Sequence, residues 1–229
     1  MTIQSKLRTH AAWLLPLLLF ALIAPLTPWL DMAIERYFYS LSGDDSHFYN
    51  NTFFRLLYDF GNLPALALIA LSLAALPLSF LFSPLAYLRK PALLAILTML
   101  IGAWLLTHLV LKDEWGRPRP KQVVEFGGTQ QYRPFWSPNF SAQPEPSKSF
   151  PCGHCTMGFF FLAPALAAKR AGRPGMSSLF FITALTLGGA LGIARMAQGG
   201  HFLSDVLFSA LLMWLTALVL EKLIYGKQQ

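Results

Sequence analysis

The sequence has few charged side chains. Asp, Glu, Lys and Arg make up only 13% of its 229 residues, against 55% apolar residues. With a mean hydropathy of +0.47, this composition excludes an ordinary soluble domain and is typical of a membrane protein. Acidic residues number 11 against 18 basic ones. No basic run exceeds two residues, so the net charge of +7 does not indicate a nucleic-acid partner.

The sequence also contains few cysteines and lacks internal repeats. Its two cysteines, Cys152 and Cys155, lie within one tetrapeptide, and their number alone defines no disulfide framework. A period of about 20 to 50 residues, which would indicate a solenoid, is missing. The size and composition therefore predict a single integral membrane domain that covers residues 1–229.

Six apolar segments are long enough, or nearly so, to cross a hydrocarbon core about 30 Å thick. The sequence therefore predicts an all-α polytopic membrane protein with six transmembrane helices in one bundle. The first segment resembles a signal peptide but has no A-x-A cleavage site, so we expect an uncleaved anchor. The segments run from Ala11 to Leu30, Leu63 to Phe82, Ala92 to Leu111, Cys152 to Ala168, Ser178 to Ala194 and Phe202 to Leu220.

Basic residues predict the orientation of this bundle. The N-terminus, the turns at 82–91 and 169–177, and the C-terminal tail are short and together hold nine Lys and Arg but only one acid, Glu221. The other side also holds nine, spread over longer stretches with ten acids. The density in short loops predicts that both termini are cytoplasmic.

Three connections then face outward. The one from Asp31 to Asn62 is polar and shows no recognisable chemistry. The one from Lys112 to Pro151 holds seven prolines and several aromatic residues, which is typical of an irregular segment at the headgroup level. It is either a lid over a site, spanning 112–151, or a plain interfacial loop. The third is a tight turn after Arg195.

Basic residues gather at the outward ends of three helices and indicate an anion site. Lys112 and Arg119 flank a segment that Pro118 and Pro120 keep from being regular helix, and Arg195 ends the fifth apolar segment. The fourth segment begins at Cys152 and Gly153, where free N–H groups would face the same side and glycine permits close approach. Together these groups predict a phosphate site. The alternative is that these Lys and Arg side chains extend to the membrane–water interface and bind no ligand.

Two histidines beside these cations could supply a reaction. His201 and Asp205 are four residues apart at a helix start, so the carboxylate can accept the ring N–H and leave the other nitrogen as a nucleophile. His154 is then available as general acid. An isolated His/Asp pair is more often a buried hydrogen bond. A metal site of His154, His201 and Asp205 is a further alternative, which three neighbouring cations disfavour.

The spacing of these residues resembles a known pattern. Lys112 with Arg119-Pro120, then Pro151-Cys-Gly-His154, then Arg195 with His201 and Asp205 are similar to the three signature motifs of the phosphatidic acid phosphatase type 2 superfamily of membrane lipid phosphatases. The strings KDEWGRPRP and RMAQGGHFLSDVLF further resemble bacterial lipid A 4′-phosphatases. The motifs span residues 112 to 205, about 40% of the chain.

The resemblance implies six core helices, a phosphohistidine intermediate on His201, and no metal or other cofactor. It implies that Lys112, Arg119 and Arg195 hold phosphate with help from the backbone at Cys152 and Gly153. It also makes His154 the acid and Asp205 the group that orients His201. Two departures stand out, because Cys152 and Ala194 replace the family's usual serines and each removes a hydroxyl that could donate to phosphate.

The resemblance leaves the substrate open. A lipid A phosphate is the first expectation, on the periplasmic face of a bacterial inner membrane. Undecaprenyl diphosphate, phosphatidylglycerol phosphate and phosphatidic acid are alternatives, as is phosphoryl transfer to another lipid.

The tetrapeptide Cys152-Gly-His-Cys155 indicates a different class of enzyme. It is the active-site sequence of protein disulfide isomerases, so the chain could instead be a membrane thiol-disulfide oxidoreductase. That motif works in a βαβ context, whereas here an apolar segment follows. The two thiols could also simply pack between helices.

Overall fold

The computed structural model describes residues 3–43, 48–141 and 146–226, and side-chain positions from residue 10 onward. All regular elements in these ranges are helical. Asp44 and Asp45 of the first outward connection, and the side chains of the basic residues Lys6, Arg8 and Lys227 near the termini, lie outside this description. The longer elements are α1 (Ile3–Ile23), α2 (Thr27–Ser40), α3 (Thr52–Phe60), α4 (Leu63–Leu81), α5 (Arg89–Leu97), the π-helical η3 (Thr98–Lys112), α6 (Gly153–Phe159), α7 (Leu162–Arg170), α8 (Pro174–Ala197) and α9 (Leu203–Tyr225). Short 3₁₀ turns are η1 (Ala24–Leu26), η2 (Ser83–Leu88), η4 (Pro120–Gln122) and η5 (Val124–Phe126).

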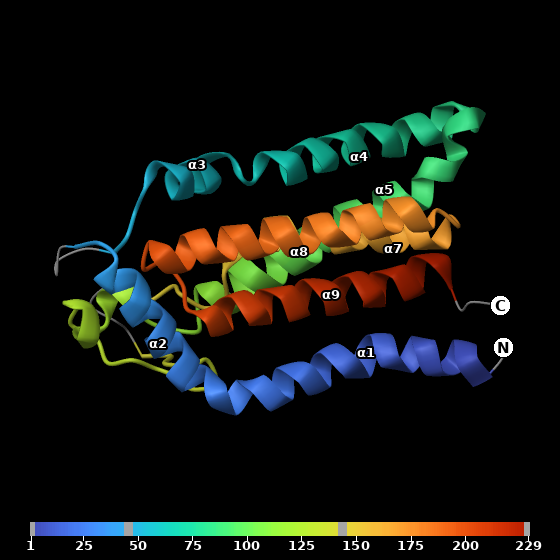
Figure 1. Ribbon diagram of the computed structural model, residues 1–229. Helices are drawn as coiled ribbons and strands as arrows, with labels where there is room; N and C mark the ends of the chain where they lie inside the picture. The colour runs from blue at the N-terminus through green and yellow to red at the C-terminus, as the bar shows by residue number, and fades with distance from the viewer. Residues whose placement is uncertain (1–2, 44–47, 142–145, 227–229) are drawn as a thin grey trace.

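The helices form one elongated bundle whose termini lie at the same end (Figure 1). The connections that hold residues 112–151 and 198–202 lie at the opposite end, beside α2 and α3. Local sequence explains several boundaries: the Asn51 side chain caps α3 by accepting from the Phe54 N–H at 2.8 Å, and Pro174 starts α8 after Gly172, whose φ is +67°.

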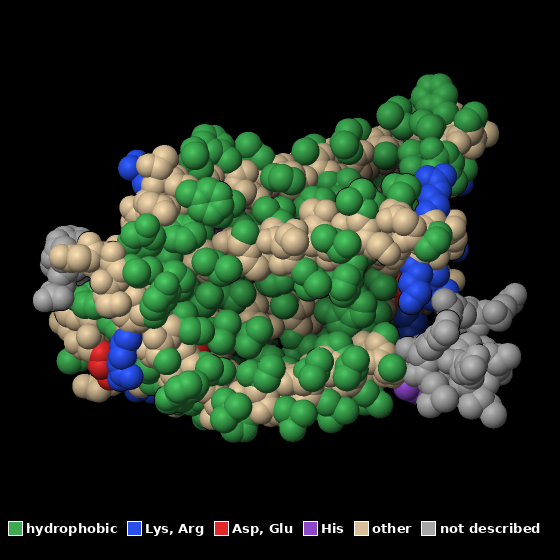
Figure 2. Space-filling model, viewed as in Figure 1, with side chains coloured by type: hydrophobic (Ala, Val, Ile, Leu, Met, Phe, Trp, Pro, Cys, Tyr) green, Lys and Arg blue, Asp and Glu red, His purple; other side chains and the backbone are tan. Residues whose placement is uncertain are grey.

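Five helical stretches in the described residues are long and apolar enough to cross a membrane: His10–Ser40, Thr52–Leu81, Ser83–Lys112, Pro174–Ala197 and Leu203–Tyr225. The all-α prediction is confirmed, whereas the count of six spans is not. Apolar side chains cover the visible middle of the bundle, with Lys and Arg near its ends (Figure 2). Such a surface suits a lipid environment rather than water.

The predicted fourth span, Cys152 to Ala168, is divided into α6 and α7. The regular pattern breaks at Phe160 and Phe161, because the Phe161 N–H bonds the Gly158 carbonyl three residues back, at 3.3 Å. This segment is the centre of the bundle: Cys155, Phe160 and Ala163 are fully buried. A Cβ at Gly158 would overlap the backbone of Gly188, so α6 and α8 approach as closely as two backbones can.

The connection between η3 and α6 is irregular, as its prolines predicted. Its described residues, 113–141 and 146–152, contain only η4, η5 and isolated bridges. Trp115 and Phe135 pack on Phe150 at ring-centroid distances of 5.0 and 5.8 Å. Two polar residues of this connection, Arg117 and Ser149, are completely buried, so the segment is anchored into the bundle.

Candidate active site

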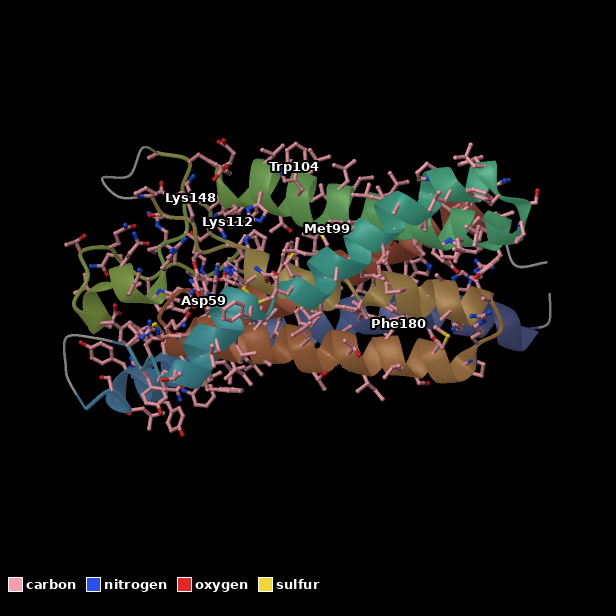
Figure 3. The ribbon with its side chains drawn as sticks, turned by 90° about the horizontal axis from the view of Figure 1, so that it is seen from above. Asp59, Met99, Trp104, Lys112, Lys148 and Phe180 are labelled. Atoms are coloured by element: carbon pink, nitrogen blue, oxygen red, sulfur yellow. A yellow bond between two sulfur atoms is a disulfide. The ribbon has the colours of Figure 1, made fainter. Side chains whose placement is uncertain are left out.

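Three cations converge at the end of the bundle opposite the termini. Arg119 and Arg195 lie within electrostatic range of the Lys112 ammonium group, and Lys112 is seen at this end in Figure 3. Within the described ranges none of the three forms a salt bridge with a carboxylate. The buried Nε atoms of Arg119 and Arg195 have no hydrogen-bond partner there. Uncompensated guanidinium groups at one point favour an anionic ligand.

Gly153 lies directly against this cluster. A Cβ on Gly153 would come within 3.3 Å of the Lys112 Nζ and 2.9 Å of the His108 ring. Glycine therefore leaves the space between the backbone and the Lys112 ammonium open. His108, one helical turn before Lys112, is a site neighbour that was not predicted from the sequence, because a lone histidine in an apolar run forms no motif.

Cys152 and Cys155 are joined by a disulfide with Cα atoms 5.4 Å apart. Both residues are fully buried. The sequence left this pairing open. A disulfide exchange enzyme needs an accessible sulfur, so complete burial weighs against the thiol-disulfide oxidoreductase alternative. The bridge brackets His154 at the start of α6.

His154 is the half-buried histidine of the site. Its ring stacks on Tyr58, with centroids 4.6 Å apart and an interplanar angle of 20°. The Arg195 guanidinium lies over the same Tyr58 ring at 4.7 Å. Lys112 and Arg119 are also within electrostatic range of His154. Tyr58 was missed from the sequence because it belongs to the first outward connection, where no chemistry was recognised.

His201 is almost completely buried, with 1% of its surface exposed. Its Nδ1 lies 2.5 Å from the Ser149 carbonyl oxygen and 3.6 Å from an Asp205 carboxylate oxygen. We expected Asp205 to accept the ring N–H, whereas the Ser149 carbonyl makes the shorter contact. Both neighbours are acceptors, so Nδ1 carries the proton and Nε2 keeps its lone pair. Burial, with the nearby Lys112, lowers the pKa of His201 to about 3, and the ring is neutral at pH 7.

Asp205 is held by donors on three sides. Its carboxylate accepts from the Ser149 hydroxyl at 2.6 Å, the Phe202 N–H at 2.8 Å and Arg117 Nη1 at 2.5 Å. Ser149 thus contacts both members of the predicted pair, through its carbonyl and its hydroxyl. Asp205 therefore acts on the His201 ring in two ways. It binds Ser149, whose carbonyl contacts the ring, and it makes its own longer contact with the ring.

Arg117 connects this site to the N-terminal third of the chain. It is fully buried between Asp205 and Asp31, whose carboxylate lies 2.8 Å from Nη2. Asp31 also accepts from the Tyr132 hydroxyl at 2.9 Å and the Ser204 N–H at 2.9 Å. Burial and the Asp31 carboxylate raise the pKa of Tyr132, which keeps its hydroxyl a donor. The connection from Asp31 to Asn62, in which the sequence shows no recognisable chemistry, thus supplies a carboxylate that pairs with Arg117. The sequence does give one sign of this contact, because Asp31 lies inside the apolar run PWLDMA. A carboxylate at such a position is costly unless it has a partner.

All predicted site residues are thus near one another: Lys112, Arg119, Cys152, Gly153, His154, Arg195, His201 and Asp205. No cluster of three or more His, Cys, Asp or Glu suited to a metal ion occurs among the described residues. The His154 ring is half-buried, whereas the His201 ring is almost completely buried.

If His154 protonates a departing oxygen, His154→Ala will slow alkyl phosphates more than an activated aryl phosphate, because a good leaving group needs less protonation. We expect about a 10²- to 10⁴-fold loss of kcat for the alkyl substrate and a clearly smaller loss for the aryl one. Arg195→Ala, as the control, will reduce both to a similar extent if Arg195 holds the phosphoryl oxygens, as the sequence predicts. Equal losses for His154→Ala on both substrates would remove its role as acid.

A protein-family model described as the PAP2 superfamily matches residues 91–228, more than half of the chain. A lipid A 4′-phosphatase of Francisella tularensis subsp. novicida is 37% identical over 143 residues, 62% of this chain and 61% of that protein. A lipid A 4′-phosphatase of Rhizobium leguminosarum is 34% identical over 123 residues, 53% of this chain and 48% of that protein. The chain thus spans roughly half to three fifths of these relatives' own lengths. No solved structure gives a significant match.

Proposed function

The chain belongs to the PAP2 superfamily, and on that premise we propose that it hydrolyses a phosphate from a membrane lipid through a phosphohistidine intermediate on His201. The observation that carries the proposal is the convergence of Lys112, Arg119 and Arg195, unpaired with carboxylates in the described residues, beside two histidines. A phosphate ester supplies the missing negative charge and a phosphorus atom for the neutral His201 ring to attack.

In the first step Nε2 of His201 attacks phosphorus while the three cations hold the non-bridging oxygens. The P–N bond forms as the P–O bond to the lipid breaks, and His154 gives its proton to the leaving oxygen. The arriving phosphate dianion favours the protonated form of His154, because it adds negative charge beside the ring. Arg117 and Ser149, through Asp205 and the Ser149 carbonyl, keep His201 in the tautomer that can attack.

In the second step water attacks the phosphohistidine from the side that the lipid alcohol has left. His154, now neutral, accepts a proton from the water, the P–N bond breaks, and inorganic phosphate departs. No metal ion is needed for this sequence, since cations of the chain stabilise the transferring group. Attack by a second lipid hydroxyl instead of water would give the phosphotransferase alternative.

For the substrate we propose a lipid A phosphate, supported by the names of the relatives. For location we propose the inner membrane of a Gram-negative bacterium, with cytoplasmic termini and a site that opens to the periplasm. The support is the placement of both termini at the end opposite the site (Figure 1) and the basic short loops. Residues 112–151 are proposed as the lid of the site. Undecaprenyl diphosphate and phosphatidylglycerol phosphate are the alternative substrates.

Expression in a Gram-negative host tests this substrate. We expect mass spectra of lipid A to show loss of one HPO₃ unit per molecule, and unchanged lipid A in cells that express His201→Ala to the same level. Unchanged lipid A with the active protein, together with faster phosphate release from undecaprenyl diphosphate in isolated membranes, would contradict the lipid A assignment and support the alternative.

A further inference from the structure

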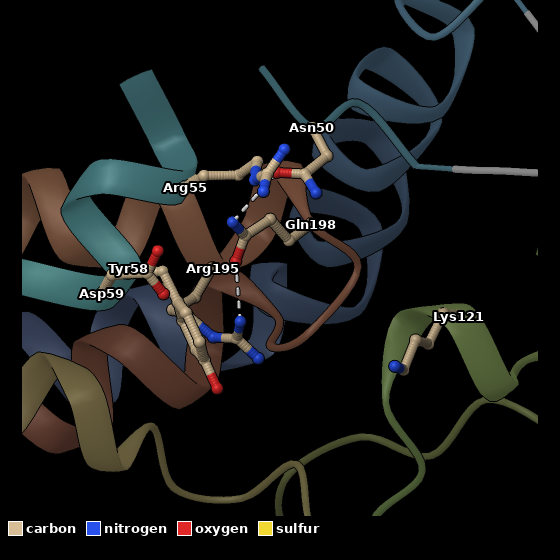
Figure 4. A pocket seen from close by; sticks show the side chains of 7 residues that line it. All are labelled: Asn50, Arg55, Tyr58, Asp59, Lys121, Arg195 and Gln198. Atoms are coloured by element: carbon tan, nitrogen blue, oxygen red, sulfur yellow. Dashed lines mark hydrogen bonds between the residues drawn. The ribbon is translucent and has the colours of Figure 1, made fainter. Parts of the chain in front are cut away.

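A pocket of about 310 Å³ opens beside the three phosphate-binding cations (Figure 4). Its wall on α3 carries Arg55, Tyr58 and Asp59, and Lys121 of η4 extends toward it from a separate segment. Asn50, Arg195 and Gln198 complete the lining. Every lining side chain is polar or aromatic, in contrast to the apolar bundle below.

The pocket is continuous with the candidate active site through two residues. Arg195 belongs to both, and Tyr58 lines the pocket while its ring stacks on His154 at 4.6 Å. His154 is the proposed donor to the leaving oxygen. The pocket therefore lies where the part of the substrate attached to that oxygen would extend, rather than where the phosphate itself is held.

Two cations of the pocket, Arg55 and Lys121, are not among the residues assigned to the phosphate site. Within the described ranges, Arg55 and Lys121 form no salt bridge and their side chains form no hydrogen bond, although Asp59 lines the same pocket. Gln198 is held by Arg195 Nη1 at 2.7 Å and by Asn50 at 3.2 Å. Two free cations suit an anionic group, whereas a carboxylate, amides and an aromatic face suit the hydroxyl groups and ring of a sugar.

We propose that this pocket is a headgroup subsite for a sugar that carries a second anionic group, bound by Arg55 and Lys121. The inference rests on the proposed function, because the headgroup is placed by its link to the phosphate that is removed. The subsite adds a substrate preference to that function. It predicts that the protein binds phosphorylated glycolipids more tightly than glycerophospholipids whose whole headgroup is a phosphate.

Binding to the His201→Ala protein tests the subsite without turnover. The probes are a diphosphorylated disaccharide lipid and phosphatidic acid in the same detergent. The double variant Arg55→Gln, Lys121→Gln lacks both cations. We expect its preference for the glycolipid, measured as the ratio of the two Kd values, to fall by at least about 10-fold. Arg36→Gln is the matched control, because Arg36 is exposed on α2 and does not line the pocket.

The outcomes separate the two proposals. An unchanged ratio of Kd values in the double variant, or no initial preference for the glycolipid, would overturn the subsite, even if the wild-type protein hydrolyses lipid phosphates. A ratio that falls as expected, with a wild-type protein that releases no phosphate from either lipid, would support the subsite and overturn the proposed hydrolysis.

Discussion

Replacing His201 by alanine will reduce phosphate release at least about 10⁴-fold, because the proposed mechanism forms its covalent intermediate on this ring. Asp205→Asn will leave a small residual rate, since the ring remains but loses a charge that helps to hold its tautomer and its surroundings. Initial rates of phosphate release from a lipid substrate in detergent measure both effects.

His10→Ala is the matched control for this substitution. His10 is exposed on α1, which begins at the end of the bundle opposite the site. Its loss will leave the rate unchanged, and thermal unfolding will show that the His201→Ala protein retains its fold. Wild-type turnover in folded His201→Ala would end the assignment of the nucleophile.

Replacing Arg117 by methionine will destabilise the protein by about 3–5 kcal/mol, because it leaves the buried carboxylates of Asp31 and Asp205 facing each other without a cation. The same substitution will lower activity, since Asp205 loses its closest donor, at 2.5 Å. The free energy of unfolding in detergent, measured by denaturant titration, gives the first effect.

The control is Lys148→Met, which also removes one partner of an ion pair. Lys148 binds Asp113 at 2.6 Å, but the two side chains are 43% and 45% exposed. Such a pair contributes about 1 kcal/mol or less. Adding Asp31→Asn to Arg117→Met will recover part of the lost stability, because it removes one of the two unpaired charges. Equal costs for Arg117→Met and Lys148→Met would contradict the structural role of Arg117.

The bundle and the convergence of the three motifs could be predicted from the sequence. Apolar length defines most of the spans, and ionisable residues at membrane depth are too costly to be scattered, so they gather at one end. The division at Phe160 and Phe161 could not be predicted. A single hydrogen bond to Gly158 instead of Met157 leaves no trace in hydropathy.

The residues that hold the site residues in place could not be predicted from the sequence either. Asp31 lies 86 residues before Arg117, and a contact of that separation has no local periodicity. The Ser149 carbonyl that orients His201 is a backbone group, which every residue possesses. Tyr58 looks like one aromatic residue among many in a membrane chain, and its packing against His154 and Arg195 distinguishes it.

On the proposed function, this chain releases phosphate from a membrane lipid with its own side chains and without a metal ion. The most direct test is to incubate purified protein with lipid A, undecaprenyl diphosphate, phosphatidylglycerol phosphate and phosphatidic acid in detergent that contains EDTA, and to measure inorganic phosphate. We expect release from lipid A at a rate that EDTA does not change, and none from lipid A with His201→Ala. No release from any of the four lipids would overturn the proposed hydrolysis, and release only when a divalent cation is restored would overturn the metal-free mechanism.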